Sequence, residues 1–300
     1  MTDFQVLPPE DGFLGLEEDA RAPAGAPKAV IIPFGLEATV SYGGGTSKGP
    51  AAMIEASHQV ELFDEEHWRE PARSFQVETW AEPEIPSKTE DALDLLAGLT
   101  KQALDEDAFP VVFGGEHSIT PGALRPYLER YPDLALLHFD AHADLRDGYE
   151  GEHYSHAAAI RRCLDAPDLS VVSIGIRNIS AGEIPFLEDN RHRVHIHWAK
   201  DKKNWDIEEM LAPLAGRPVY VTFDLDGFDA SLMPATGTPE PGGLFWDDVM
   251  PIFKRAAEIS TWVGADINEL APRPELHGCD FLAAKLAYKI LGYRFLTDVK

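Results

Sequence analysis

The stretch Leu134–Asp144, LALLHFDAHAD, decides the predicted fold, because an apolar run ends in two acids and a histidine. Its first residues are apolar without alternation, which is typical of a strand covered on both faces of a parallel sheet. Asp140, His142 and Asp144 follow, and alternate residues of an extended chain point the same way. Ligands of open parallel sheets bind beyond the carboxyl ends of the strands, so we expect a functional site here.

Similar short apolar or β-branched runs recur along the chain, and helical patterns lie between them. In residues 89–107 the apolar side chains repeat at i, i+3, i+4 and i+7, as in an amphipathic helix. This alternation predicts an α/β fold with a mainly parallel sheet covered by helices on both faces. The predicted strands are 29–35, 110–115, 134–141, 170–176, 193–198, 218–226 and 262–269. Further helices are expected at 50–62, 155–164, 246–258 and 280–291.

The composition is that of an ordinary globular protein, with 44% apolar residues among the 300. The formal net charge of −25 comes from 26 basic and 51 acidic residues, and it repels phosphate backbones and anionic lipid. We therefore expect no nucleic-acid partner and no membrane partner. The first residues lack the pattern of a secretory signal and two cysteines cannot form a disulfide framework, so a cytoplasmic location is expected.

We divide the chain into an N-terminal arm, residues 1–27, and a single domain, residues 28–300. The arm is rich in proline, alanine and acids without sustained periodicity, so we expect it on the surface or on a neighbouring subunit. Its apolar patch, Phe13–Leu16, is a candidate subunit contact. No linker interrupts the sequence after residue 28.

Acids and histidines gather at the ends of four predicted strands, where Glu116-His117, Asp140–Asp144, Asp224–Asp226 and Asp266–Glu269 lie. Carboxylates that converge at an apolar strand end cost several kcal/mol each to desolvate unless a cation neutralises them. Two divalent ions would supply that compensation. Oxygen ligands outnumber nitrogen and no thiol is offered, which favours Mn²⁺, while Zn²⁺ and Ni²⁺ stay open as alternatives. The candidate ligands are His117, Asp140, His142, Asp144, Asp224 and Asp226.

Three other histidines are not assigned to the site. His138 has the same strand parity as Asp140, and we predict a packed core histidine. His195 and His197 lie on a predicted strand without neighbouring acids, so a structural or surface role is expected.

Five separated motifs resemble, in order, those of the ureohydrolases, the family of arginases, agmatinases and their relatives. The likeness spans about residues 28–295, and SYGGGTSKGPAAMIEAS (41–57) is most similar to bacterial and archaeal agmatinases. It implies the arginase-like three-layer α/β/α sandwich, with residues 28–300 as one catalytic domain and a homo-oligomer, a trimer or hexamer. The motifs are GGEHS (114–118), DAHADLR (140–146), SHAAAIRR (155–162), FDLDGFDASLMPATGTPEPGG (223–243) and ADINELAP (265–272).

The resemblance implies two Mn²⁺ per subunit, with Asp140 and Asp224 bridging both ions. His117 and Asp144 would complete the ligands of one ion, and the remaining two candidates those of the other. It also implies cleavage of a guanidino group to urea and an amine, with the metal pair activating the attacking water.

Catalytic roles are implied for three residues. Asp144 would orient the attacking water and pass its proton to the leaving nitrogen, His156 would serve as acid or proton shuttle, and Glu269 would hold the guanidinium nitrogens. Asp229 matches the third acid of the DxDxxD motif and is a weaker candidate beside the metal ligands. Glu116 stands where many relatives have Asp, so we expect a changed contact next to the metal without its loss.

The expected substrate is a small cationic guanidine, most simply agmatine, which would give putrescine and urea. Glu150 and Glu152 are candidates to attract its distal ammonium. Arg146 favours the alternative of a guanidino-acid hydrolase such as guanidinobutyrase, because a fixed cation there would bind a substrate carboxylate. Arginase, a deacetylase-like amidohydrolase with one Zn²⁺ and a catalytically silent binding subunit are the further alternatives.

Overall fold

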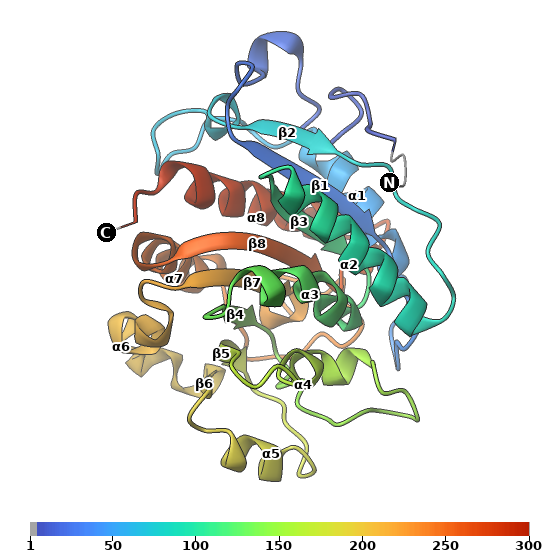
Figure 1. Ribbon diagram of the computed structural model, residues 1–300, viewed down its shortest axis with the longest axis vertical. Coiled ribbons are helices and arrows are strands. Elements are labelled where there is room, and N and C mark those ends of the chain that lie inside the picture. Colours follow the sequence, from blue (N-terminus) through green and yellow to red (C-terminus); the bar gives the residue numbers. More distant parts are fainter. Residues whose placement is uncertain (1–4, 300) are drawn as a thin grey trace.

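The computed structural model describes residues 5–299, which fold around one eight-stranded sheet in which all neighbouring strands run parallel (Figure 1). The strands are β1 Lys28–Phe34, β2 Gln76–Thr79, β3 Phe109–Gly114, β4 Ala135–Phe139, β5 Ser170–Ile176, β6 Val194–Trp198, β7 Pro218–Asp224 and β8 Thr261–Asn268. Their order in the sheet is β2-β1-β3-β8-β7-β4-β5-β6.

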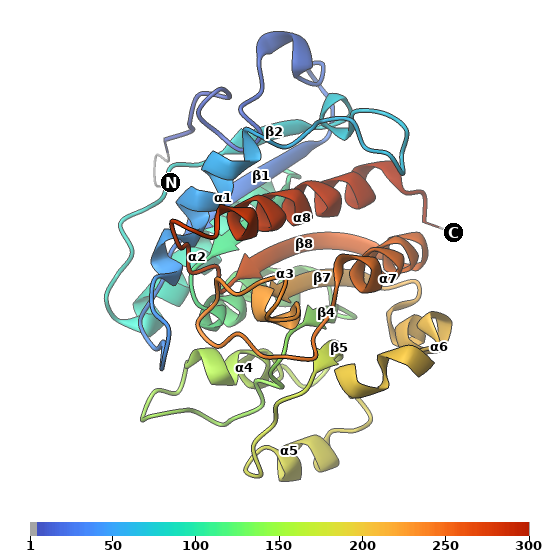
Figure 2. The same ribbon diagram turned by 180° about the vertical axis from the view of Figure 1, so that it is seen from behind.

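Helices cover both faces of this sheet. One layer, in front in Figure 1, contains α2 Thr89–Asp105, α3 Thr120–Arg130, α4 Ala159–Cys163 and α5 Ile184–Asp189. The other layer, in front in Figure 2, contains α1 Gly49–Ser57, α6 Ile207–Leu211, α7 Trp246–Ile259 and α8 His277–Leu296. The predicted three-layer α/β/α sandwich with a parallel sheet is therefore confirmed. None of the helices within residues 5–299 is both long and apolar enough to cross a membrane.

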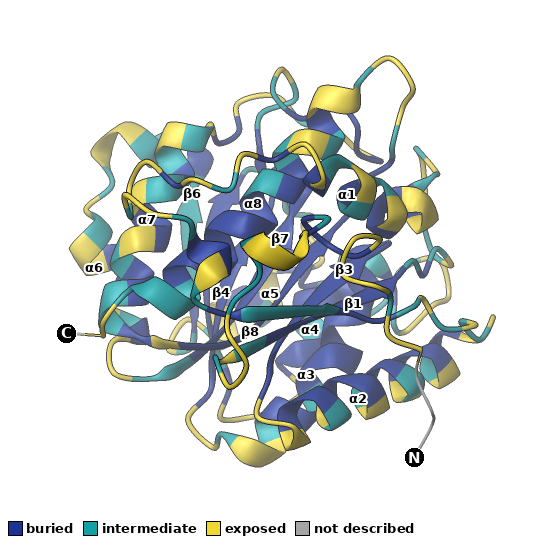
Figure 3. Cartoon of the chain, turned by 90° about the horizontal axis from the view of Figure 1, so that it is seen from above, coloured by how far each residue is buried: buried dark blue, intermediate teal, exposed yellow. Residues whose placement is uncertain are grey.

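Alternation along the strands divides the apolar core between the two layers. Leu137 and Val221 belong to the cluster that packs under α1 and α8, whereas Leu136 and Tyr220 belong to the cluster under α2 and α3. Every residue of β4 is buried, unlike those of the edge strands β2 and β6 (Figure 3), and this explains why its sequence is apolar without alternation.

The strand order determines where the chemistry lies. β3, β8, β7 and β4 are consecutive neighbours in the sheet, so the polar motifs that follow them emerge side by side at its carboxyl edge. The register aligns His138 with Thr222, and Thr222 in turn with Asp266. One rim therefore collects side chains from segments more than a hundred residues apart in sequence.

Some predicted boundaries differ from the structure. β2 was not predicted, because this four-residue edge strand is only partly buried and lacks an apolar run. The helix expected at 50–62 ends at Ser57, whose hydroxyl donates to the carbonyl of Ile54 and accepts from the backbone of Leu14. The helix expected at 155–164 is divided into a 3-10 turn, His156–Ala158, and α4.

The predicted subunit contact through Phe13–Leu16 is wrong. Phe13, Leu14 and Leu16 are buried within the chain itself, and the ring of Phe13 packs edge-on against Phe113 of β3. The backbone of Phe13 also donates to the hydroxyl of Thr79 in β2. These apolar side chains complete the chain's own core and are not available to a partner.

Candidate metal centre

The segment after β4 brings Asp140, His142 and Asp144 to the carboxyl edge of the sheet. Because β4 ends at Phe139, the strand alternation that predicted a shared direction does not extend over these residues. Asp144 instead has a φ of 52°, in the left-handed region that side-chain-bearing residues seldom adopt. Such strained positions cluster at functional sites, and here the carboxylate of Asp144 faces His117.

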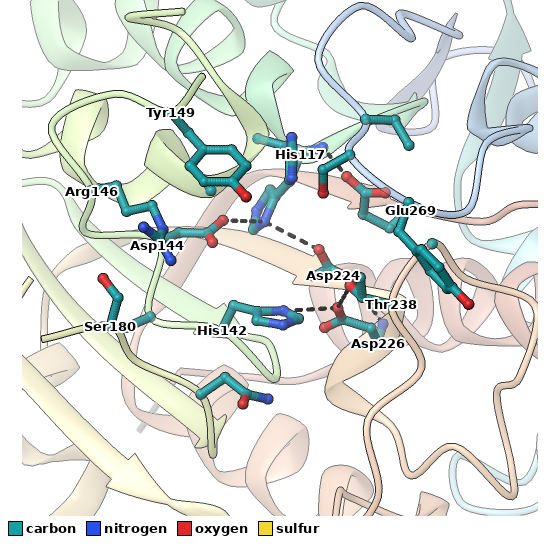
Figure 4. Close-up of a pocket in the computed structure, with 18 of the residues that line it drawn as sticks. His117, His142, Asp144, Arg146, Tyr149, Ser180, Asp224, Asp226, Thr238 and Glu269 are labelled. Atoms are coloured by element: carbon teal, nitrogen blue, oxygen red, sulfur yellow. Dashed lines mark hydrogen bonds and ion pairs between the residues drawn. The ribbon is translucent and has the colours of Figure 1, made fainter. Parts of the chain in front are cut away.

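His117 lies at the centre of one half of the cluster (Figure 4). Its Nδ1 is 3.1 Å from Asp140 Oδ2, 3.2 Å from Asp144 Oδ2 and 3.4 Å from Asp224 Oδ2. On the other side of the ring, Nε2 lies 2.8 Å from the hydroxyl of Thr222, which itself donates to Asp266. Nε2 therefore carries a hydrogen, and Nδ1 is the nitrogen that faces the three carboxylates, so a metal ion would take the place of a proton on Nδ1.

His142 forms the other half of the cluster. Its Nδ1 lies 2.9 Å from Asp226 Oδ2 and 3.6 Å from Asp140 Oδ1. The two oxygens of Asp140 thus face different histidines, which places this carboxylate between the two halves. Asp224 and Asp226 come from the turn that ends β7, where Asp224 Oδ1 accepts the backbone N–H of Asp226.

Burial and the charges of neighbouring side chains shift the pKa values of the residues in this cluster. Burial alone would lower the pKa of His117, but the carboxylates of Asp140, Asp144 and Asp224 raise it well above its usual value. Burial similarly opposes the charge of His142, yet Asp226 and Asp140 raise its pKa to about 12. Both histidines therefore favour the protonated, positively charged form while no cation is bound to the cluster.

Two of the acids have raised pKa values, which means that their negative charge also lacks compensation. Burial, together with the charge of Asp140, raises the pKa of Asp144 to about 7. Burial and the charges of Asp226 and Asp140 raise the pKa of Asp224 well above its usual value.

These donors fit a divalent-metal centre. His117 Nδ1 is a buried nitrogen without a hydrogen-bond partner among residues 5–299, although three carboxylates surround it. Imidazole nitrogen and carboxylate oxygen are ligands of Mn²⁺, Zn²⁺ and similar ions. A bound cation would give this nitrogen a partner and would neutralise the repulsion among the carboxylates.

A cavity of about 290 Å³ opens over the cluster. Glu269, which follows β8 with a φ of 69°, lines this cavity together with His156. Its Oε1 accepts the backbone N–H of His117 at 2.7 Å, whereas Oε2 makes no hydrogen bond with any described residue. Burial, with the nearby charge of Glu116, raises the pKa of Glu269 to about 8.

The family model described as Arginase family matches residues 27–292. The chain belongs to the arginase family. It is 36% identical over 288 residues to the N(1)-aminopropylagmatine ureohydrolase of Synechocystis sp., covering 93% of this chain and 92% of the relative. It is also 36% identical over 251 residues to the agmatinase of Bacillus cereus, covering 82% of this chain and 84% of the relative.

A solved arginase-family structure has the same architecture. The agmatine ureohydrolase of Thermoplasma volcanium superposes with a TM-score of 0.78 at 29% sequence identity. The match covers 92% of this chain and 93% of that one. The arginase-like fold expected from the sequence motifs is thus confirmed.

The structure brings together all six residues predicted as ligands. Asp140 lies fully buried beneath the cavity, and the other five line it. The predicted catalytic residues Asp144, His156 and Glu269 also line it. That these side chains bind metal and catalyse stays a prediction. Their convergence on one cavity supports it.

Arg146 lines the same cavity, with its guanidinium carbon 4.8 Å from the ring centre of Tyr149. Glu150 and Glu152 are exposed in the following turn and do not belong to the cavity wall. The structure therefore does not bring these two acids to the place where we expected a distal ammonium.

Asp229 lies outside the cavity wall and closes a loop instead. Its Oδ2 accepts the backbone N–H groups of Gly242 and Gly243, and its Oδ1 accepts both the backbone and the hydroxyl of Ser231. These hydrogen bonds lower its pKa to about 2. The third acid of the DxDxxD motif thus supports the segment that carries Thr238 to the cavity.

His138 lies closer to the site than its sequence pattern predicted, and Glu183 belongs to the cavity wall although no motif marked it. His138 is buried as expected, but its Nε2 also lies 2.9 Å from Asp140 Oδ2. Glu183 lines the cavity and accepts hydrogen bonds from the backbone of Leu145 and Ser180. The one available signal was position, since Glu183 follows the carboxyl end of β5 as the recognised motifs follow their strands.

Proposed function

We propose that this chain is a divalent-metal-dependent ureohydrolase that hydrolyses agmatine to putrescine and urea. The observation that carries the proposal is the unpartnered Nδ1 of His117, surrounded by three carboxylates under a cavity. Membership of the arginase family supports it, and the relative from Bacillus cereus is named agmatinase.

The proposed cofactor is a pair of Mn²⁺ ions held by the six predicted ligands. The two oxygens of Asp140 face different histidines, His117 and His142, and this supports a bridging role for the carboxylate. Bound divalent ions would supply the positive charge that makes a water acidic near neutral pH. The number of ions and a homo-oligomeric assembly, a trimer or hexamer, rest on the family resemblance.

The remaining groups would bind and orient the guanidinium. Glu269 has one oxygen occupied by the backbone of His117 and one left for the cavity, so it would accept a charge-assisted hydrogen bond from a guanidinium nitrogen. Asp144 would orient the attacking water and deliver its proton to the leaving nitrogen. His156, at the cavity wall, would exchange protons with the departing amine.

N(1)-aminopropylagmatine is a second candidate substrate, because the Synechocystis relative that carries this name matches 93% of the chain. It shares the guanidino end of agmatine and differs by a longer amine. Arg146 lies at the cavity wall, where its charge would attract a substrate carboxylate. Hydrolysis of a guanidino acid therefore stays an alternative.

Urea release from a panel of guanidines tests the proposal. The manganese-loaded chain is assayed with agmatine, N(1)-aminopropylagmatine, arginine and 4-guanidinobutyrate, and kcat/KM is compared. We expect agmatine to exceed arginine and 4-guanidinobutyrate by at least about 100-fold, which corresponds to about 2.7 kcal/mol. A best kcat/KM with either carboxylate-bearing guanidine would refute the agmatinase proposal, and a best value with the aminopropyl compound would select the second candidate.

A further inference from the structure

The hydroxyl of Thr39 joins the predicted proton shuttle to a buried acid. Thr39 Oγ1 lies 3.0 Å from His156 Nδ1 and 2.9 Å from Glu116 Oε1. It also accepts the backbone N–H of His156 at 3.0 Å. Three segments that are distant in sequence therefore meet at one oxygen atom next to the cavity.

Glu116 is a fully buried acceptor. Its Oε2 receives the backbone N–H groups of Ala38 and Thr39 at 2.8 and 2.7 Å. Its Oε1 receives the hydroxyl of Ser118 at 2.5 Å in addition to that of Thr39. Two backbone N–H groups and two hydroxyls therefore meet this side chain, and both of its oxygens are placed to accept hydrogen bonds.

A hydroxyl has one hydrogen to donate and two lone pairs to accept with, and this restricts the tautomer of His156. The hydrogen of Thr39 is directed to the carboxylate of Glu116. The two lone pairs then receive the backbone N–H of His156 and its ring nitrogen Nδ1. For that second contact to be a hydrogen bond, Nδ1 must carry the proton.

The other ring nitrogen is left for the cavity. His156 lines the cavity, and the hydroxyls that contact its ring, those of Thr39 and Ser155, both lie at Nδ1. The second hydroxyl near the ring, Ser155 Oγ, lies 3.5 Å from Nδ1 and is therefore a weaker contact. Burial lowers the pKa of His156, which favours the neutral imidazole that a tautomer describes.

We propose that Thr39, backed by Glu116, is a positioning residue that keeps the proton of neutral His156 on Nδ1 and leaves Nε2 to exchange protons with the substrate. The catalytic consequence rests on the proposed function, whereas the tautomer does not.

A double-mutant cycle tests the catalytic consequence. Thr39→Val removes the hydroxyl while keeping the shape, and we expect it to lower kcat for agmatine at least about tenfold, a part of what a positioned proton donor contributes. In a His156→Asn background the same substitution should have no further effect. Thr39→Ser should restore kcat, because it returns the hydroxyl. Equal losses in both backgrounds would overturn the proposal.

The matched control is Thr100→Val. Thr100 is fully buried in α2, and within residues 5–299 its hydroxyl bonds only to the helix carbonyls of Leu96 and Ala97. This substitution loses the same chemical group away from the cavity and should leave kcat unchanged.

Nitrogen-15 shifts of the histidine rings give a readout that does not depend on activity. They are recorded on the full chain at about pH 8, where an ordinary histidine is neutral, with and without diamagnetic Zn²⁺, and His156 is identified by its loss in His156→Asn. We expect a protonated Nδ1 in the unsubstituted chain and mixed tautomers in Thr39→Val and Glu116→Gln. An unprotonated Nδ1 in the unsubstituted chain would overturn the proposal even if urea is released. A protonated Nδ1 without urea release would instead contradict the proposed function alone.

Discussion

At the residue scale, the position of each hydrogen decides what the site can do. His117 gives its Nε2 hydrogen to Thr222, which leaves the lone pair of Nδ1 for a cation. The proposed arrangement at His156 is the reverse, with Nδ1 protonated and Nε2 open to the cavity. Two histidines of the same cavity are thus suited to different tasks, metal binding and proton transfer, by the hydroxyls beside them.

Glu269→Gln tests how the guanidinium is bound. The amide keeps the shape but loses the charge, so kcat/KM for agmatine is expected to fall by about 10- to 100-fold, matching about 1.5–3 kcal/mol for a hydrogen bond to a charged group. Urea assays give kcat/KM, and metal analysis of the same preparation is the control, because the amide oxygen still accepts the backbone N–H of His117. An unchanged kcat/KM would remove Glu269 from substrate binding.

The sequence could predict the residues that end apolar strands but not their partners from elsewhere. Asp224 ends β7, Asp140 directly follows β4 and His117 lies shortly after the end of β3, so the parallel-sheet rule brought them to one edge. Glu183 reaches the cavity, and Thr39 reaches the ring of His156 beside it, on loops whose paths depend on tertiary packing. Position after β5 was the one signal for Glu183, and the strand rule offered none for Thr39.

At the element scale, a parallel sheet makes distant segments into neighbours. β3, β8, β7 and β4 are adjacent, and this order was not contained in the hydrophobic pattern that predicted the strands. The pattern was sufficient for strands buried on both faces, such as β4, because they read as continuous apolar runs. It failed for β2, which is short and only partly buried at the edge.

The contact between β8 and α3 is sensitive to a single methyl group. A Cβ at Gly264 would overlap the hydroxyl and ring of Tyr127, which is fully buried in the core. We expect Gly264→Ala to lower the free energy of unfolding by about 1–3 kcal/mol, as overpacking does. Gly98→Ala in α2 is the matched control, because nothing lies within 4 Å of its added Cβ. Urea denaturation should show that this control is neutral or stabilising by about 0.5–1 kcal/mol, and equal losses would contradict the packing.

α8 is attached to the segment around residue 64 by a buried ion pair. Lys289 Nζ lies 2.7 Å from Asp64 Oδ2, with the two side chains 2% and 1% exposed. Burial alone would raise the pKa of Asp64, but hydrogen bonds from His67 and Lys289 lower it below its usual value of 3.8. A lowered pKa in the folded state means that the carboxylate stabilises the fold above pH 3.8 and loses this effect as the pH falls through the folded value.

Asp64→Asn should therefore destabilise the chain by about 3 kcal/mol at neutral pH, where the buried Lys289 keeps only its ion pair with the exposed Glu65 among the described residues. The difference from the unsubstituted chain should shrink as the pH falls below 3.8. Denaturation curves at several pH values measure it. The control is Asp105→Asn, which breaks an exposed pair with Lys101 and should cost less than about 1 kcal/mol. A loss for Asp64→Asn that is independent of pH would refute this assignment.

At the scale of the whole molecule, the surplus of acids suits a cationic substrate. The net charge of −25 attracts small cations and repels anions before any contact is made. The same preference for cations is concentrated in the cluster under the cavity, where burial raises the pKa of Asp144 and Asp224. The sequence predicted this electrostatic character from composition, whereas the convergence of the acids on one cavity required the fold.

The most direct test of the metal centre is urea release from agmatine as Mn²⁺ is added back to the chelated chain. We expect no activity without metal and a rise that levels off at two ions per chain. Asp226→Asn, which alters the carboxylate facing His142, should bind less metal and lose at least about 100-fold in kcat/KM, while Asp229→Asn should keep its metal. Full activity of the exhaustively chelated chain would contradict the account.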